Sequence, residues 1–97
     1  MDEFACTHAW VEGRVQGVGF RYFVQEEAQG LGITGWVRNV GEDRVEVWAE
    51  GKKANLTELL NSLQHGPSSA YVSDVRVEWE SPKGVYPSFQ IISSAWF

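Results

Sequence analysis

The sequence is poor in cysteine and in positive charge, and it contains no long hydrophobic run. Cys6 is the single cysteine among 97 residues, so no internal disulfide can form. One thiol and two distant histidines predict no metal site. The longest apolar stretch spans only a few residues, which excludes a membrane-spanning helix. Residues 1–4 lack the basic and apolar parts of a secretory signal, so we expect a cytoplasmic protein.

Basic residues are few. Eight of them face 13 acidic residues, which gives a formal net charge of −5. This acidity argues against double-stranded nucleic acid or an anionic membrane as a partner. Hydrophobic residues make up 43 % of the chain, and five tryptophans and five phenylalanines supply large apolar surfaces. We therefore expect one folded domain over residues 1–97, with a core from about residue 7 to 92.

The spacing of apolar residues predicts the element order β-α-β-β-α-β, followed by a short last strand. Alternation predicts strands over residues 7–13, 33–39, 44–50, 75–79 and 89–92. Helical spacing predicts helices over residues 20–31 and 56–63. This order is typical of an α+β fold, the ferredoxin-like split β-α-β sandwich. In it an antiparallel sheet carries two helices on one face, and the other face meets solvent.

A glycine-rich segment, Gly-Arg-Val-Gln-Gly-Val-Gly-Phe-Arg over residues 13–21, leads from the first strand into the first helix. Glycine permits positive φ and a close approach of the main chain to a ligand. Successive N–H groups at a helix N-terminus form an anion site. An ordinary loop is the alternative. We predict that a phosphate is surrounded by the main-chain N–H groups of Val15, Gln16, Gly17, Val18, Gly19 and Phe20.

Two side chains add to this prediction. Arg21 lies in the first helical turn, where the helix dipole disfavours a cation unless an anion shares the site; its planar guanidinium suits phosphate oxygens. Asn39 ends the predicted second strand, and its amide can both donate and accept, as a group that orients a water must. The alternatives are an Arg21 that points into water and an Asn39 that merely favours a turn. Arg14, Arg38 and Arg44 lie beside these segments and predict a local positive funnel.

These residues resemble the acylphosphatase family. Residues 13–21 look like its phosphate-loop signature without a mismatch, and residues 35–39, with Val45-Glu46-Val47 and Glu50-Gly51, look like its second signature. The similarity covers the chain from about residue 7 to 92. Asp43 stands where the family usually has glycine, and Asp tolerates the left-handed backbone that such a turn uses. Residues 93–97 run past the usual family end and are assigned no role.

The resemblance implies an acylphosphatase, an acylphosphate phosphohydrolase. Such an enzyme splits the carboxyl–phosphate anhydride of small acyl phosphates, such as acetyl, carbamoyl or glyceroyl phosphate, into carboxylate and inorganic phosphate. It implies that Arg21 binds the phosphate, that Asn39 positions the water, and that the loop amides complete the cradle. The resemblance further implies that the enzyme needs no metal and no cofactor. It also implies that the partner is the small-molecule substrate and that the enzyme acts as a monomer.

Two other functions stay open. A binding module would hold phosphate or carbamoyl phosphate without turnover, as a domain of a larger carbamoyl-transferring protein would. An RNA binder would stack bases on Trp10 and Trp48, although the acidic charge counts against it. We expect Cys6 to be a buried or edge-strand thiol rather than a nucleophile. We expect His8 on the exposed face of the first strand and His65 at a helix C-terminus.

Overall fold

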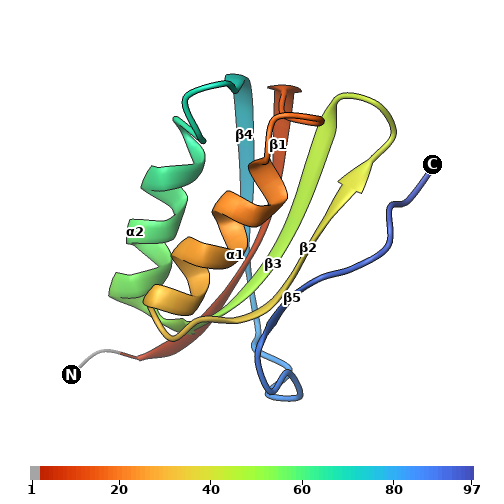
Figure 1. Ribbon diagram of the computed structural model, residues 1–97. Coiled ribbons are helices and arrows are strands. Elements are labelled where there is room, and N and C mark those ends of the chain that lie inside the picture. The colour runs from red at the N-terminus through yellow and green to blue at the C-terminus, as the bar shows by residue number, and fades with distance from the viewer. Residues whose placement is uncertain (1–2) are drawn as a thin grey trace.

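The computed structural model describes residues 3–97 and has seven elements in the predicted order (Figure 1). Both helices have 11 residues, and no helix of the described chain is long and apolar enough to cross a membrane. Several elements extend beyond their predicted bounds. Phe4 and Ala5, for example, pair with the end of the third strand. No alternation of apolar residues predicts this extension. The elements are β1 (Phe4–Arg14), α1 (Phe20–Gly30), β2 (Thr34–Val40), β3 (Arg44–Lys52), α2 (Lys53–Leu63), β4 (Tyr71–Glu80) and β5 (Phe89–Ile91).

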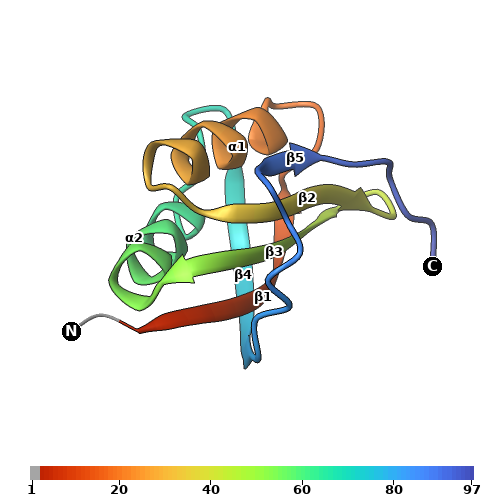
Figure 2. The same ribbon diagram turned by 90° about the horizontal axis from the view of Figure 1, so that it is seen from below.

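The strands form one sheet in the order β4-β1-β3-β2-β5. β1 pairs antiparallel with β3 and β4, and β2 pairs antiparallel with β3. β5 is the exception, because it lies parallel to β2. The sheet is therefore mixed, and the prediction of a wholly antiparallel sheet was wrong at this edge. The chain after β4 crosses to the opposite edge before it pairs, and it then runs in the same direction as β2 (Figure 2).

Both helices cover one face of the sheet and form the hydrophobic core with it (Figure 2). Ala9 and Val11 of β1 and Val45 and Val47 of β3 point into this core, as their alternation predicts. Burial of one Leu or Phe side chain contributes about 1.5–3 kcal/mol relative to exposure, so the helices are held mainly by their apolar sides. The helix side chains that are fully buried are Phe20, Val24, Ala28, Leu56, Leu59 and Leu63.

The other face of the sheet is partly covered, whereas the sequence predicted that it meets solvent. Glu50 is only 1 % exposed there. Its carboxylate accepts hydrogen bonds from the main-chain N–H groups of Lys83 and Gly84, both at 3.0 Å, and from Trp48 Nε1 at 2.7 Å. Burial alone would raise the pKa of Glu50, but these three hydrogen bonds together hold it below its usual value. The connection between β4 and β5 is thus fastened across the sheet.

His8 also lies on this face, but it is not simply exposed as predicted. Its Nε2 lies 2.6 Å from Glu46 Oε2, and its ring centre lies 4.0 Å from that of Trp10. Glu46 Oε1 accepts a hydrogen bond from Arg38 Nε at 2.7 Å. Trp48 on the adjacent strand β3 and Trp36 on β2 also lie against the imidazole, and the side chain of His8 is only 19 % exposed.

Candidate active site

The loop between β1 and α1 begins at an irregularity in β1. The register of β1 against β4 shifts between Glu12 and Gly13. Gly13 has φ 134°, and a Cβ atom there would lie 2.2 Å from the carbonyl oxygen of Tyr71. Only glycine fits this backbone and this close contact. The bulge turns the chain out of the sheet just before the predicted phosphate loop.

The loop itself presents unpaired main-chain donors. Gly17 and Gly19 have φ values of 71° and 77°, and Gly19 caps α1 without any side-chain hydrogen bond. Within residues 3–97, none of the N–H groups from residue 15 to 20 has an acceptor. A Cβ atom at Gly17 or Gly19 would meet nothing within 4 Å, so the space beside both glycines is open. Free N–H groups at the positive end of a helix dipole form a site for an anion.

Arg21 lies in the first turn of α1 and is half-buried. That turn contains no acidic residue, and Arg21 makes no hydrogen bond or ion pair with any other residue that the structure describes. A guanidinium without a carboxylate partner, placed where the helix dipole repels it, is suited to an external anion.

Asn39 is brought to the same end of the molecule by β2. It pairs with Val45 in the antiparallel register, so its side chain lies on the helix-covered face, two residues beyond the buried Val37. Its Oδ1 is buried and has no hydrogen-bond partner within residues 3–97. A buried amide oxygen is normally paired, so this acceptor is available to a bound molecule such as water.

The side chain of Gln16 joins the loop to the end of β2. Its Nε2 donates to the carbonyl oxygens of Arg44 at 2.9 Å, Gly41 at 3.1 Å and Val40 at 3.4 Å. The N–H of Gly13 adds a bond to the carbonyl oxygen of Asp43 at 3.1 Å. The glycine-rich loop is thus fastened to the hairpin that follows Asn39. The sequence predicted a role only for the main chain of Gln16, although a polar side chain within a glycine-rich loop could have indicated a structural role.

The hairpin itself differs from the expectation at Asp43. No non-glycine residue of the described chain has positive φ, so Asp43 is not left-handed. Gly41 adopts this conformation instead, with φ 60°. The turn therefore does not require glycine at position 43.

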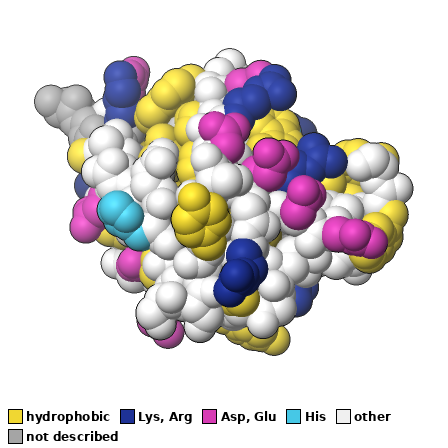
Figure 3. Space-filling model, turned by 90° about the horizontal axis from the view of Figure 1, so that it is seen from above, with side chains coloured by type: hydrophobic (Ala, Val, Ile, Leu, Met, Phe, Trp, Pro, Cys, Tyr) yellow, Lys and Arg dark blue, Asp and Glu magenta, His cyan; other side chains and the backbone are white. Residues whose placement is uncertain are grey.

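The predicted funnel of four arginines is not formed. Arg38 lies on the opposite face of the sheet from Asn39, where Glu46 pairs with it. Arg44 lines a hollow with Trp10, Glu12, Asp74 and Arg76 on that same face. Figure 3, which views the end of the molecule with the loop and the hairpin, shows basic and acidic side chains intermixed rather than one positive patch. The sequence could have predicted this separation of Arg38 from Asn39, because consecutive residues of a strand point to opposite faces of the sheet.

Cys6 is fully buried in β1. Burial first, and then the nearby carboxylates of Glu50 and Glu80, raises the pKa of its thiol to about 12. The buried position confirms the prediction of a buried thiol, and a raised pKa favours the protonated form, which is a poor nucleophile. Among residues 3–97, no three His, Cys, Asp or Glu side chains are grouped closely enough to hold a metal ion.

These features define the class: a ferredoxin-like α+β protein with an open loop of main-chain donors between its first strand and first helix. The acylphosphatase family model matches residues 7–91. The chain belongs to the acylphosphatase family, as its glycine-rich signature indicated.

Individual relatives agree with this assignment. The chain is 42 % identical to an acylphosphatase of Acaryochloris marina, over 95 % of this chain and 98 % of that protein. It is similar in structure to acylphosphatase from Bacillus subtilis, with a TM-score of 0.87 and 38 % identity over 91 % of this chain and 98 % of that chain. It also matches part of full-length HypF in a phosphate- and nucleotide-bound form, with a TM-score of 0.90 and 26 % identity over 99 % of this chain and 13 % of that chain.

Proposed function

We propose that the chain hydrolyses small acyl phosphates, with the loop of residues 15–20 and Arg21 holding the phosphoryl group and Asn39 positioning the attacking water. The observation that carries the proposal is the buried, unpaired Oδ1 of Asn39. It belongs to the strand end to which Gln16 fastens a loop of unpaired N–H groups. The two sets of groups supply what phosphoryl transfer to water needs: stabilised phosphate oxygens and an oriented nucleophile.

The chemistry needs few further groups. The oxygen of water attacks phosphorus, and the bond between phosphorus and the acyl oxygen breaks, with its electron pair leaving on a carboxylate. Such a carboxylate has a conjugate acid of pKa about 4, so it departs without a proton from the protein. The proton lost by water ends on a phosphate oxygen of the product. Asn39 Oδ1 accepts a hydrogen bond from the water, and the N–H groups and Arg21 offset charge on the phosphoryl oxygens.

All of the proposed groups come from one chain, so we propose a monomer that acts on a small molecule without a resident metal or cofactor. Size-exclusion chromatography with light scattering tests the oligomeric state. Turnover in the presence of EDTA tests whether the chain acts without a metal. Residues 15–21 would then supply the positive potential that a metal ion supplies in other phosphoryl-transfer enzymes.

The deciding experiment measures hydrolysis of acetyl phosphate and benzoyl phosphate in EDTA, together with inhibition by inorganic phosphate. Arg21→Ala is expected to lower kcat/KM about 100-fold or more and to weaken inhibition by phosphate. Asn39→Ala is expected to lower kcat about 100-fold with little change in the inhibition by phosphate, because Asn39 orients the water and does not bind the phosphoryl group. The matched control is Arg76→Ala, since Arg76 lies on the opposite face and is expected to leave both quantities unchanged.

The rival reading of a binding module has its own outcome. If the wild-type chain binds phosphate yet hydrolyses no acyl phosphate, the module replaces the enzyme. If Arg21→Ala retains full kcat/KM, the assignment of Arg21 is lost.

A further inference from the structure

The segment after β5 continues to pair with β2 as far as Val40, where Ala95 forms a parallel bridge. β5 itself reaches Val37, where Ile91 is the partner. Further along, the N–H of Ala95 donates to the carbonyl oxygen of Asn39 at 2.9 Å, and the N–H of Gly41 donates to the carbonyl oxygen of Ala95 at 2.8 Å. Ala95 is itself buried. We call residues 95–97 the clip.

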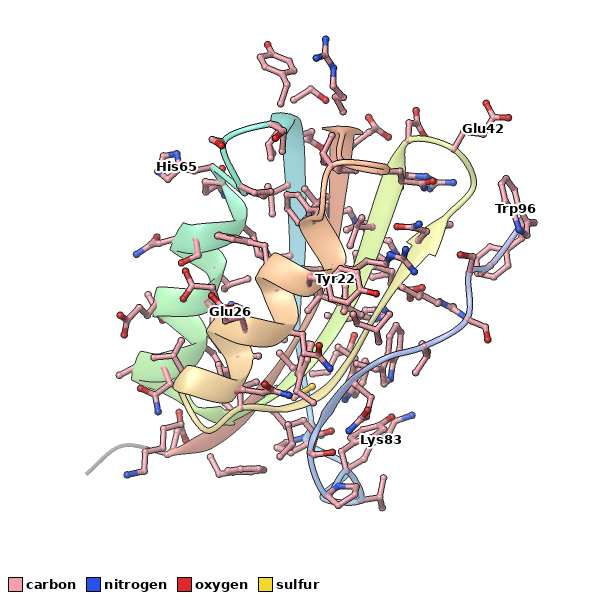
Figure 4. All side chains as sticks on the ribbon, in the orientation of Figure 1. Tyr22, Glu26, Glu42, His65, Lys83 and Trp96 are labelled. Carbon is pink, nitrogen blue, oxygen red and sulfur yellow. The ribbon has the colours of Figure 1, made fainter. Side chains whose placement is uncertain are left out.

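The clip also contacts the residue before Asn39. The guanidinium carbon of Arg38 lies 5.3 Å from the ring centre of Phe97 and 5.2 Å from that of Trp36. An arginine within about 6 Å of two aromatic ring centres gains cation–π attraction from each ring. Trp96, between the two contacting residues of the clip, is 72 % exposed. Figure 4 shows it beside the hairpin that carries Glu42 and at the opposite end of the molecule from Lys83.

Gly41 is where the clip and the phosphate loop meet. Its N–H is bound by Ala95, and its carbonyl oxygen accepts from the Gln16 side chain at 3.1 Å. Asn39 lies two residues before it, at the end of a strand whose outer edge is paired here by Ala95. Without Ala95 the outer main-chain groups of Asn39 and Gly41 would bond only to water, as those of a frayed strand end do.

We propose that the clip positions Asn39: Ala95 fixes the main chain from which the water-orienting amide projects. Ala95 is thus a positioning residue, and this inference rests on the proposed function. A displacement of about 1 Å in a group that orients a nucleophile lowers the rate up to about 100-fold. The phosphate site depends on residues 15–21, so the clip is expected to affect kcat and not phosphate binding.

Ala95→Pro removes the N–H that bonds to Asn39, whereas Ala95→Gly keeps it and Trp96→Ala alters only an exposed side chain. We expect Ala95→Pro to lower kcat about 10-fold or more. Inhibition by inorganic phosphate should stay within about twofold of wild type, and both controls should keep their kcat. In an Asn39→Ala background, Ala95→Pro should change kcat less than about twofold, because the group that it positions is already absent.

The proposal is overturned if folded Ala95→Pro keeps the wild-type kcat, if phosphate inhibition weakens as much as kcat falls, or if the loss is as large in the Asn39→Ala background. Where Ala95→Pro does not fold by circular dichroism, the chain ended after Ser94 takes its place. If neither variant folds, residues 95–97 serve the fold itself and the positioning role is likewise overturned. Failure of the proposed function is a separate result, namely a wild-type chain that hydrolyses no acyl phosphate.

Discussion

Asn39 carries a buried side-chain oxygen that has no hydrogen-bond partner in the described part of the chain. Among residues 3–97, Asn39 Oδ1 is the buried side-chain oxygen or nitrogen without a partner. A buried acceptor without a hydrogen bond costs about 1–3 kcal/mol of folding stability. Glu46 and Glu50 are also buried, yet each accepts hydrogen bonds from two or more groups. The contrast supports the proposal that Asn39 serves a bound molecule rather than the fold.

The unpaired oxygen predicts a gain in stability when it is removed. Asn39→Val places a β-branched apolar side chain on the helix-covered face of β2 and deletes the unsatisfied acceptor. We expect the free energy of unfolding to rise by about 1 kcal/mol, or the melting temperature by about 4–8 °C, while hydrolysis is lost. Thermal unfolding followed by circular dichroism measures this. A melting temperature below that of wild type would mean that Asn39 is already satisfied in the folded protein.

The β1–α1 loop owes its shape to backbone conformation rather than to packing. Gly19 adopts φ 77° at the start of α1, yet a Cβ atom there would touch nothing. Gly30, at the other end of α1, also has open space around it but no positive φ. The two glycines therefore separate the cost of a left-handed backbone from the cost of crowding.

This pair gives a matched prediction. Gly19→Ala is expected to lower the free energy of unfolding by about 1–2 kcal/mol, because alanine in the left-handed region is strained, and to weaken inhibition by phosphate as the first turn of α1 shifts. Gly30→Ala is expected to be neutral or to stabilise by up to about 1 kcal/mol. Urea unfolding and phosphate inhibition of both variants test this. Equal stabilities would contradict the strain at Gly19.

Across the molecule, the connection between β4 and β5 joins the two outer edges of the sheet. It passes over the face without helices, where Glu50 binds the main chain of Lys83 and Gly84 and Lys83 Nζ lies 4.9 Å from the Trp48 ring centre. The connection leads to β5 and then to Ala95, both of which pair with β2 at that edge of the sheet.

The lowered pKa of Glu50 predicts how stability depends on pH. A carboxylate whose folded pKa lies below its unfolded value stabilises the protein above that unfolded value, and the contribution is lost as the pH falls through the folded pKa. Glu50→Gln is therefore expected to lower the free energy of unfolding by about 1–3 kcal/mol at pH 7. The difference from wild type should shrink as the pH falls below the ordinary value of 4.5.

Urea unfolding of both proteins between pH 7 and about pH 3 measures this difference, within the range in which carboxylates titrate. The control Glu78→Gln removes an exposed ion pair with Arg76 and is expected to change stability by less than about 0.5 kcal/mol at any pH. A constant difference between Glu50→Gln and wild type would contradict the role of the charge.

Local patterns in the sequence predicted the order of the helices and strands, their buried faces and the glycine-rich turn. The alternation at Ala9 and Val11 and the helical spacing of Leu56 and Leu59 predicted which faces are buried, because a pleated strand and an α-helix each have a fixed period. The glycines of residues 13–19 predicted a turn with positive φ before a helix, since glycine adopts that conformation without steric cost. The same alternation placed Arg38 and Asn39 on opposite faces, although the predicted funnel overlooked it.

Contacts between distant segments could not be predicted in this way. The direction of β5, the burial of Glu50 and the bond between Ala95 and Asn39 each depend on how the chain crosses the sheet after β4. The segment Ser-Ser-Ala-Trp-Phe shows no alternation or helical spacing of apolar residues that would predict its structure. A main-chain N–H group can bond to any carbonyl that the fold brings near it, so the partner of Ala95 could not be predicted. Residue type therefore sufficed wherever the deciding interaction was local in the chain, and tertiary structure decided wherever main-chain groups far apart in sequence had to find each other.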